Sequence, residues 1–194
     1  MLLKQDRGSM ETNEETTVFL SPKQVDKLIG HAKRNSERDG LILSLMWKCG
    51  LKTNEVASIK KAHISPDEQT IVVGKKNRVV PVERELMESL RGYVSTAHTN
   101  SDDETHIFVA QGTKNKLTSR RIQNMVRDYS NQIGLGDLTP NHIRKSFAAY
   151  FLKKTNDINA LREMLGQKDL YTTQRYLGAI KKADIEKLYH GIWK

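Results

Sequence analysis

Side chains that could carry out chemistry gather in three short segments of the C-terminal third of this 194-residue sequence. These segments are residues 138–148, 165–167 and 172–176, and they contain Arg144 and Tyr176. A guanidinium group can hold two oxygens of one phosphate in a planar fork, and a tyrosine oxygen can act as a nucleophile. These residue types suit chemistry on a phosphate group.

The sequence lacks the usual motifs for a metal or an organic cofactor. It has no glycine-rich phosphate loop, no His-Glu-x-x-His motif and no pair of cysteines or histidines at ligand spacing. The six histidines, at positions 31, 63, 98, 106, 142 and 190, are scattered. Cys49 is the single cysteine and lies among apolar residues, which predicts a buried thiol. We therefore expect neither a cofactor nor a bound metal.

The three segments resemble the C-terminal motifs of the tyrosine recombinase, or phage integrase, family. In that family a Thr-Pro-His-x-Leu-Arg-His-Thr-Phe-Ala segment supplies a histidine and the second active-site arginine. A Leu-Gly-His segment follows, and the nucleophilic tyrosine lies nine residues beyond its last residue. Here Tyr176 lies nine residues beyond Gln167.

Two earlier parts of the sequence resemble the same family. Residues 49–55 are similar to its Thr-Gly-Leu-Arg-x-Ser-Glu segment. Gly74 and Lys75, followed by residues 79–82, are similar to its lysine-bearing hairpin. Because the matches occur in the family's order over about residues 20–180, the resemblance covers most of the chain.

The resemblance implies DNA cleavage through a covalent link. In the family a tyrosine oxygen attacks a DNA phosphodiester, so that rejoining needs neither ATP nor a metal. Carried over by position, Tyr176 is the nucleophile, Arg144 the second arginine and Lys75 the lysine that protonates the departing 5′ oxygen. The alternative for Lys75 is a hairpin tip that only contacts phosphates. Lys76 is expected on the opposite face if the strand is regular.

Three positions depart from the family's catalytic pattern. Lys52 stands at the place of the first arginine, Asn141 at that of the first histidine, and Gln167 at that of the later histidine or tryptophan. Lysine keeps the charge without the planar fork, and an amide does not transfer a proton at neutral pH. We expect phosphate binding to survive better than catalysis. His142 is not expected to replace Asn141, because helix positions 142 and 144 do not share a face.

The chain is basic, with 32 lysines and arginines against 23 acidic residues and a net charge of +9. Residues 1–17 are net acidic, so this charge belongs to the remainder. Together with the resemblance, it predicts double-stranded DNA as the partner. The residues expected to contact DNA are Lys76, Arg78, Lys114, Lys116, Arg120, Arg121, His142, Lys145, Lys168 and Arg175. An ordinary solvated surface is the alternative for them.

The residue pattern predicts a mostly helical domain with a small antiparallel β-sheet, an α+β fold, as the resemblance also implies. Two β-branched runs, residues 70–73 and 79–82, predict a hairpin with a basic tip. The short apolar run 107–109 is a candidate for a further strand. Helices are expected from Pro22, at about 40–49, after Thr53 or Asn54, and at about 83–97, 118–132, 140–154, 157–165, 171–178 and 183–193.

The expected domain organisation is simple. Residues 1–17 are polar and aperiodic, and we expect a disordered or vector-derived tail. Residues 18–194 are expected to form the recombinase-like catalytic domain, with no N-terminal core-binding domain in this chain. Residues 183–193 are expected to pack on their own core or on another copy in a homo-oligomer on DNA. No apolar run reaches the length of a membrane span, and a cytoplasmic location is expected.

Three functions remain open from the sequence. The first, which we favour, is a site-specific recombinase or integrase that works poorly through Tyr176; Tyr171 is the only nearby rival for the nucleophile. The second is a recombinase-like protein that binds DNA as an accessory factor. Tyr176 and Arg144 support the first, and the three substitutions support the second. The third is a helical partner-binding domain unrelated to DNA.

Overall fold

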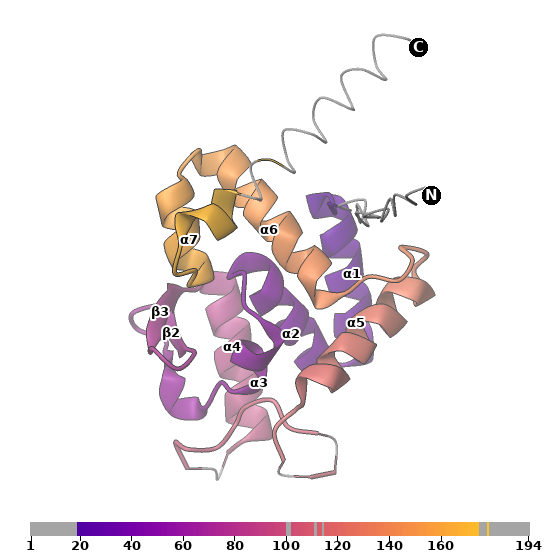
Figure 1. The fold of residues 1–194 in the computed structure, drawn as a ribbon. Helices are drawn as coiled ribbons and strands as arrows, with labels where there is room; N and C mark the ends of the chain where they lie inside the picture. The colour runs from indigo at the N-terminus through magenta and orange to yellow at the C-terminus, as the bar shows by residue number, and fades with distance from the viewer. Residues whose placement is uncertain (1–18, 100–101, 111, 114, 175–177, 179–194) are drawn as a thin grey trace, which may run out of the picture.

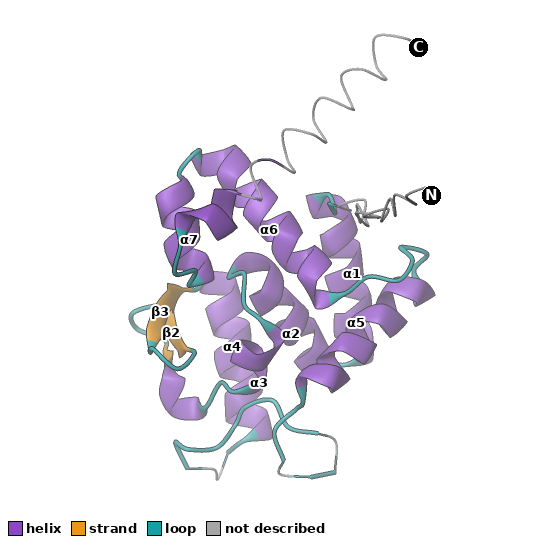
Figure 2. Ribbon diagram, in the orientation of Figure 1, coloured by secondary structure: helices purple, strands orange, loops and turns teal. Residues whose placement is uncertain are grey.

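The computed structural model describes residues 19–99, 102–110, 112–113, 115–174 and 178. Over this part the chain is mostly helical, with one small sheet (Figures 1 and 2). The elements are α1 (Pro22–Asn35), α2 (Glu37–Lys48), α3 (Thr53–Ala57), the 3₁₀ turn η1 (Lys61–His63), β1 (Ile64–Ser65), β2 (Thr70–Val73), β3 (Arg78–Pro81), α4 (Arg84–Ala97), α5 (Ser119–Gln132), α6 (Pro140–Thr155) and α7 (Ile158–Leu165). The predicted α+β fold class is confirmed.

Helix α2 is the central element of the core. Its side chains from Leu41 to Leu43 and from Leu45 to Trp47 are buried, as its apolar sequence predicts. It packs against α1, α4 and α6, and Figure 1 shows it enclosed by them. Gly40 permits the close crossing with α1, because a Cβ atom there would lie 2.9 Å from the Cα atom of Lys33. The thiol of Cys49 at the end of α2 is buried, and burial raises its pKa to about 12.

The sheet is antiparallel, with strand order β1-β2-β3. The predicted hairpin is confirmed: Thr70 pairs with Pro81 and Val73 with Arg78, and a four-residue turn from Gly74 to Asn77 joins the strands. Gly74 has a φ of 73°, which glycine adopts without steric cost. The third strand is β1 and not residues 107–109. Ile107 and Phe108 are fully buried core residues, and Val109 forms only an isolated bridge with Lys116.

Two helix starts and two left-handed turns place the segments that were expected to carry the chemistry. Helix α6 begins at Pro140, as predicted, and Thr139 is its cap. Asp157 caps α7 by accepting hydrogen bonds from two backbone amides, each 2.9 Å long. The chain leaves α7 at Gly166, with φ 62°, and leaves α2 through Gly50, also with φ 62°.

Beyond α7 the described chain forms one more helical turn at residues 170–174. The rest of the helix expected at 171–178, apart from residue 178, and the helix expected at 183–193 lie outside the described residues, as does the tail at 1–17. Within the part of the chain that the structure describes, no helix is both long and apolar enough to cross a membrane.

Candidate active site

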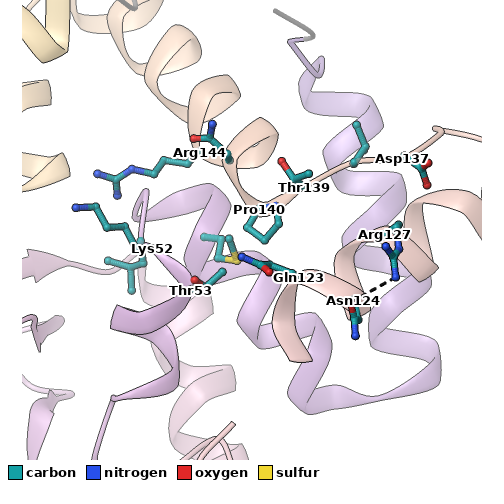
Figure 3. A pocket seen from close by; sticks show the side chains of 13 residues that line it. Lys52, Thr53, Gln123, Asn124, Arg127, Asp137, Thr139, Pro140 and Arg144 are labelled. Atoms are coloured by element: carbon teal, nitrogen blue, oxygen red, sulfur yellow. Dashed lines mark hydrogen bonds between the residues drawn. The ribbon is translucent and has the colours of Figure 1, made fainter. Parts of the chain in front are cut away.

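A groove of about 650 Å³ lies between the N-terminal ends of α3 and α6 and one face of α5. It brings together three of the predicted site residues, Lys52, Asn141 and Arg144, from segments about 90 positions apart in the sequence. Figure 3 shows the side chains of Lys52 and Arg144 extending toward the same end of the groove. The opposite wall is formed by Gln123, Asn124 and Arg127 of α5.

The guanidinium group of Arg144 is held almost entirely by the protein. Its side chain is 6% exposed; Nη1 donates to the backbone oxygen of Gly50, and Nη2 donates to that of Leu165 at 2.8 Å. The carboxylate of Glu55 lies 3.9 Å from Nη1. A buried cation needs such acceptors and a counter-charge. They fix the orientation of Arg144 at the end of the groove.

Glu55 connects several parts of the site. Its Oε2 atom accepts a hydrogen bond from the backbone amide of Lys52 at 2.8 Å, which caps α3. Its Oε1 atom accepts one from Nη2 of Arg78 at 2.7 Å, and only 11% of its side chain is exposed. The sequence analysis did not select Glu55. A glutamate three residues after a helix cap is nevertheless the usual signal for a side chain that accepts a hydrogen bond from the backbone amide of the cap residue.

Arg78 lies against the end of α7. Besides its contact with Glu55, its Nη1 atom donates to the backbone oxygen of Met164, and its side chain is 15% exposed. The sequence predicted DNA contact for this residue. In the structure its guanidinium group donates to two partners inside the protein, Glu55 and the backbone oxygen of Met164.

Lys75 and Lys76 are exposed in the turn of the hairpin. The expected alternation of their side chains across a strand does not apply, because neither residue belongs to β2 or β3. The turn begins beside the carboxylate of Glu55: a Cβ atom at Gly74 would lie 3.6 Å from Oε1. The lysine-bearing turn therefore starts next to the residue that contacts Arg144.

Gln167 follows the Gly166 turn and contacts the helical turn beyond it. Its Oε1 atom accepts a hydrogen bond of 2.6 Å from the hydroxyl of Thr173, which is fully buried. Asp169 caps this helical turn, and its hydrogen bonds from Thr172 hold the pKa of the Asp169 carboxyl below its ordinary value. Tyr176 lies outside the described residues, as do Lys114 and Arg175.

His142 takes part in the start of α6. Its Nδ1 atom accepts a hydrogen bond of 3.0 Å from the backbone amide of Thr139. Asn141 and Arg144 line the groove together, as their spacing of three on one helix predicts. His142 is turned back toward the helix cap instead.

The remaining basic residues lie around α5, α6 and the end of α7. Lys116, Arg120, Arg121 and Lys168 are exposed, and Lys145 is partly buried. Ile122 and Val126 are buried on the inner face of α5. Among the described residues, no three His, Cys, Asp or Glu side chains are grouped so that they could hold a metal ion.

Several known proteins are similar to this chain in sequence and in fold. Residues 18–182 match the phage integrase family. Tyrosine recombinase XerA of Thermococcus kodakarensis is 32% identical over 163 residues, which cover 81% of this chain and 56% of the relative. Tyrosine recombinase XerC of Neisseria gonorrhoeae is 32% identical over 143 residues, which cover 72% of this chain and 46% of the relative.

Two solved structures agree with the sequence matches. The crystal structure of XerA recombinase is 25% identical, with a TM-score of 0.76, and the match covers 88% of this chain and 65% of that one. The XerH site-specific recombinase, in a post-cleavage complex with its palindromic difH substrate, is 20% identical, with a TM-score of 0.75. That match covers 92% of this chain and 54% of XerH.

The fold and the groove with its buried arginine define the catalytic domain of a tyrosine recombinase. The chain belongs to the phage integrase family. It spans little more than half the length of the curated XerA relative.

Proposed function

We propose that this protein cleaves and rejoins double-stranded DNA at specific sites through a 3′-phosphotyrosyl link to Tyr176. The observation that carries the proposal is the fixed Arg144, which lines an open groove together with Lys52 in a chain of this family. A guanidinium group oriented in advance stabilises the charge that develops on the oxygens of a phosphate under attack.

The reaction that we propose exchanges one phosphoester bond for another. The Tyr176 oxygen bonds to phosphorus, the bond from phosphorus to the 5′ oxygen breaks, and the phenol proton is lost to water. The departing 5′ oxygen takes a proton from Lys75. Arg144 and Lys52 stabilise the non-bridging oxygens, and rejoining is the reverse reaction.

The three departures from the family pattern lead us to propose that cleavage is slow. Lys52 supplies one ammonium group in place of a fork, so it constrains the phosphate less. Asn141 and Gln167 offer amide donors but no group that titrates near neutral pH. Once the Gln167 oxygen accepts the Thr173 hydrogen bond, its amide nitrogen remains as the donor toward DNA.

We propose that DNA lies along the groove and across the N-terminal end of α5. The first turn of α5 carries Arg120 and Arg121 and no acidic residue, although cations are unfavourable at that end of a helix. Binding of phosphates would offset this cost. Lys76, Lys116, His142, Lys145 and Lys168 are proposed as further contacts, and the same role for Lys114 and Arg175 falls outside the described residues.

The remaining parts of the proposal concern assembly, location and the N-terminal residues. We propose that copies of the chain associate on DNA through residues 183–193 and that the protein acts in the cytoplasm. Residues 1–17 are proposed to be a tail outside the catalytic domain. The amphipathic pattern of residues 183–193 supports the proposed association, and the expected DNA partner supports the proposed location.

A covalent adduct would test the proposed reaction directly. We would incubate the full chain with labelled nicked duplexes of randomised central sequence and separate the products by denaturing electrophoresis. We expect an adduct that disappears in Tyr176→Phe and persists in the matched control Tyr171→Phe. An adduct that survives Tyr176→Phe would refute the assignment of the nucleophile.

A second function, that of a DNA-binding accessory protein, is favoured by Lys52, Asn141 and Gln167. If the same duplexes are retarded in native gels but give no adduct, this second function replaces the first. If the duplexes are not retarded at all, both functions are wrong.

A further inference from the structure

Arg78 stands at the base of the turn that carries Lys75. It is the first residue of β3, pairs with Val73 of β2, and follows the four turn residues directly. Those turn residues are all exposed, and both Gly74 and Asn77 adopt positive φ angles. The position of the turn relative to the groove is therefore set largely by what holds its base.

The Arg78 side chain holds that base to two other elements. Nη2 donates to Glu55 of α3 at 2.7 Å, and Nη1 donates to the backbone oxygen of Met164 in α7. A guanidinium group can donate to two separate acceptors through its two Nη atoms, and a lysine ammonium, which has a single nitrogen, does not reproduce this arrangement. Figure 1 shows β3 lying beside α7, as these contacts require.

The space for the Arg78 side chain is provided by Gly166. A Cβ atom at Gly166 would lie 2.6 Å from Nε of Arg78 and 3.2 Å from Cζ, so a side chain at position 166 would displace the side chain of Arg78. The next residue along the chain is Gln167. The guanidinium group thus lies directly against the turn that leads toward the segment of Tyr176.

Arg78 and Arg144 bind neighbouring points of the same structure. Arg78 donates to the backbone oxygen of Met164 and Arg144 to that of Leu165, and both approach the carboxylate of Glu55. The C-terminal end of a helix favours cations, and one carboxylate between two guanidinium groups reduces their repulsion. A change at Arg78 would therefore alter the placement of the turn with respect to Arg144.

We infer that Arg78 is a positioning residue, which sets the hairpin lysine Lys75 against the phosphate held by Arg144. This inference rests on the proposed function and assigns Arg78 a role inside the protein in place of contact with DNA. The role is specific to one half of the reaction, because Lys75 protonates the departing 5′ oxygen and takes no part in the attack.

A change of leaving group separates this role from a general structural one. Nicked duplexes would carry either the normal 5′ oxygen or a bridging 5′ sulfur, whose thiolate leaves without a proton because thiols have a pKa of about 8.5. On the oxygen substrate we expect Arg78→Ala to slow adduct formation on the order of 100-fold, the scale of a misplaced catalytic group. On the sulfur substrate the rate should return to within about tenfold of the wild type, as it should for Lys75→Ala.

Three further variants complete the test. Arg78→Lys keeps the charge but loses the fork, so it should show the same pattern with a smaller loss on oxygen, and it carries the test if Arg78→Ala fails to fold. Arg84→Ala removes the same charge from an exposed residue of α4 and should leave both rates unchanged. Arg144→Ala should be slow on both substrates, because it acts on the non-bridging oxygens.

The outcomes separate the two proposals. If the folded Arg78 variants cleave the oxygen substrate at the wild-type rate, Arg78 does not position Lys75. The inference is equally wrong if sulfur rescues Lys75→Ala but neither Arg78 variant. If the wild type forms no adduct with either substrate, the proposed function itself is overturned, and this role with it.

Discussion

Glu55 allows two arginines to share the end of one helix. Arg78 and Arg144 each donate to a carbonyl of the last turn of α7, and both side chains are largely buried. Removing the partner of a buried ion pair is strongly destabilising, by about 3–5 kcal/mol, since it leaves an uncompensated charge. One carboxylate therefore supports both the orientation of Arg144 and the attachment of the hairpin.

Lys52 and Asn141 lie in the groove, but their side chains lack the chemistry of the family's arginine and histidine. We expect this lack to limit the rate of DNA cleavage. Both side chains line the groove with Arg144, so restoring the family's residues should restore function. We expect Lys52→Arg combined with Asn141→His to raise the rate of adduct formation by at least about tenfold, because the pair regains a phosphate fork and a titratable group.

The measurement is the rate of adduct formation on nicked duplexes, with Lys23→Arg on the exposed face of α1 as the matched control. The control should have no effect. If the double variant gains nothing, residues 52 and 141 do not occupy the places of the family's arginine and histidine.

At the level of elements, local signals predicted most of the fold. Ser21 as a cap residue and the proline after it marked the start of α1, and the β-branched runs marked the hairpin. The start of α2 at Glu37 was missed: Ser36 caps it, but its first turn is polar, so the apolar pattern begins later. Strand β1, with two residues, is too short to show any periodicity.

The candidate site was predictable only in part, for the same physical reason. Motif spacing predicted that Asn141 and Arg144 lie side by side, because they stand three positions apart on one helix. The contact between Arg78 and the end of α7 joins residues 86 positions apart, and no local pattern encodes it. The basic side chain of Arg78 therefore suggested DNA contact, whereas its nearest acceptors belong to the protein.

The turn between α2 and α3 offers a test of how tightly the elements are packed around Arg144. Gly50 has a φ of 62°, and a Cβ atom there would lie 2.5 Å from the ring of Phe147 in α6. We expect Gly50→Ala to lose about 1–2 kcal/mol through its left-handed backbone and about 1–3 kcal/mol more through overpacking.

Gly134→Ala provides the matched control for this prediction. Its φ is 75°, but nothing lies within 4 Å of the added Cβ atom, so only the backbone cost applies. The free energy of unfolding, measured by urea denaturation, should fall further for Gly50→Ala than for Gly134→Ala. Equal losses would show that α6 moves aside and that the packing at Phe147 is not tight.

At the scale of the whole molecule, four distant segments must meet before the site exists. Residues 50–55, 74–78, 141–144 and 164–167 come from separate elements and are joined through buried hydrogen bonds and charges. Loss of global folding should therefore abolish the site as a unit. We expect the proposed DNA binding, in contrast, to depend on exposed cations around the site, so that removal of these cations should leave the fold intact.

The salt dependence of DNA binding tests whether exposed cations outside the buried site carry the contacts to DNA. For the wild type, the logarithm of the affinity should fall linearly with the logarithm of salt concentration, because bound phosphates release counterions. We expect Arg120→Ala combined with Arg121→Ala to reduce that slope by roughly 2, since each lost phosphate contact removes about 0.9.

The matched control, Arg84→Ala with Arg91→Ala, removes the same charge from exposed positions of α4, which packs on α2 away from the groove. The control should change the slope little, and fluorescence anisotropy with a labelled duplex at several salt concentrations measures both. Equal slopes for the two double variants would mean that the N-terminal end of α5 does not lie on DNA and that total charge alone drives binding.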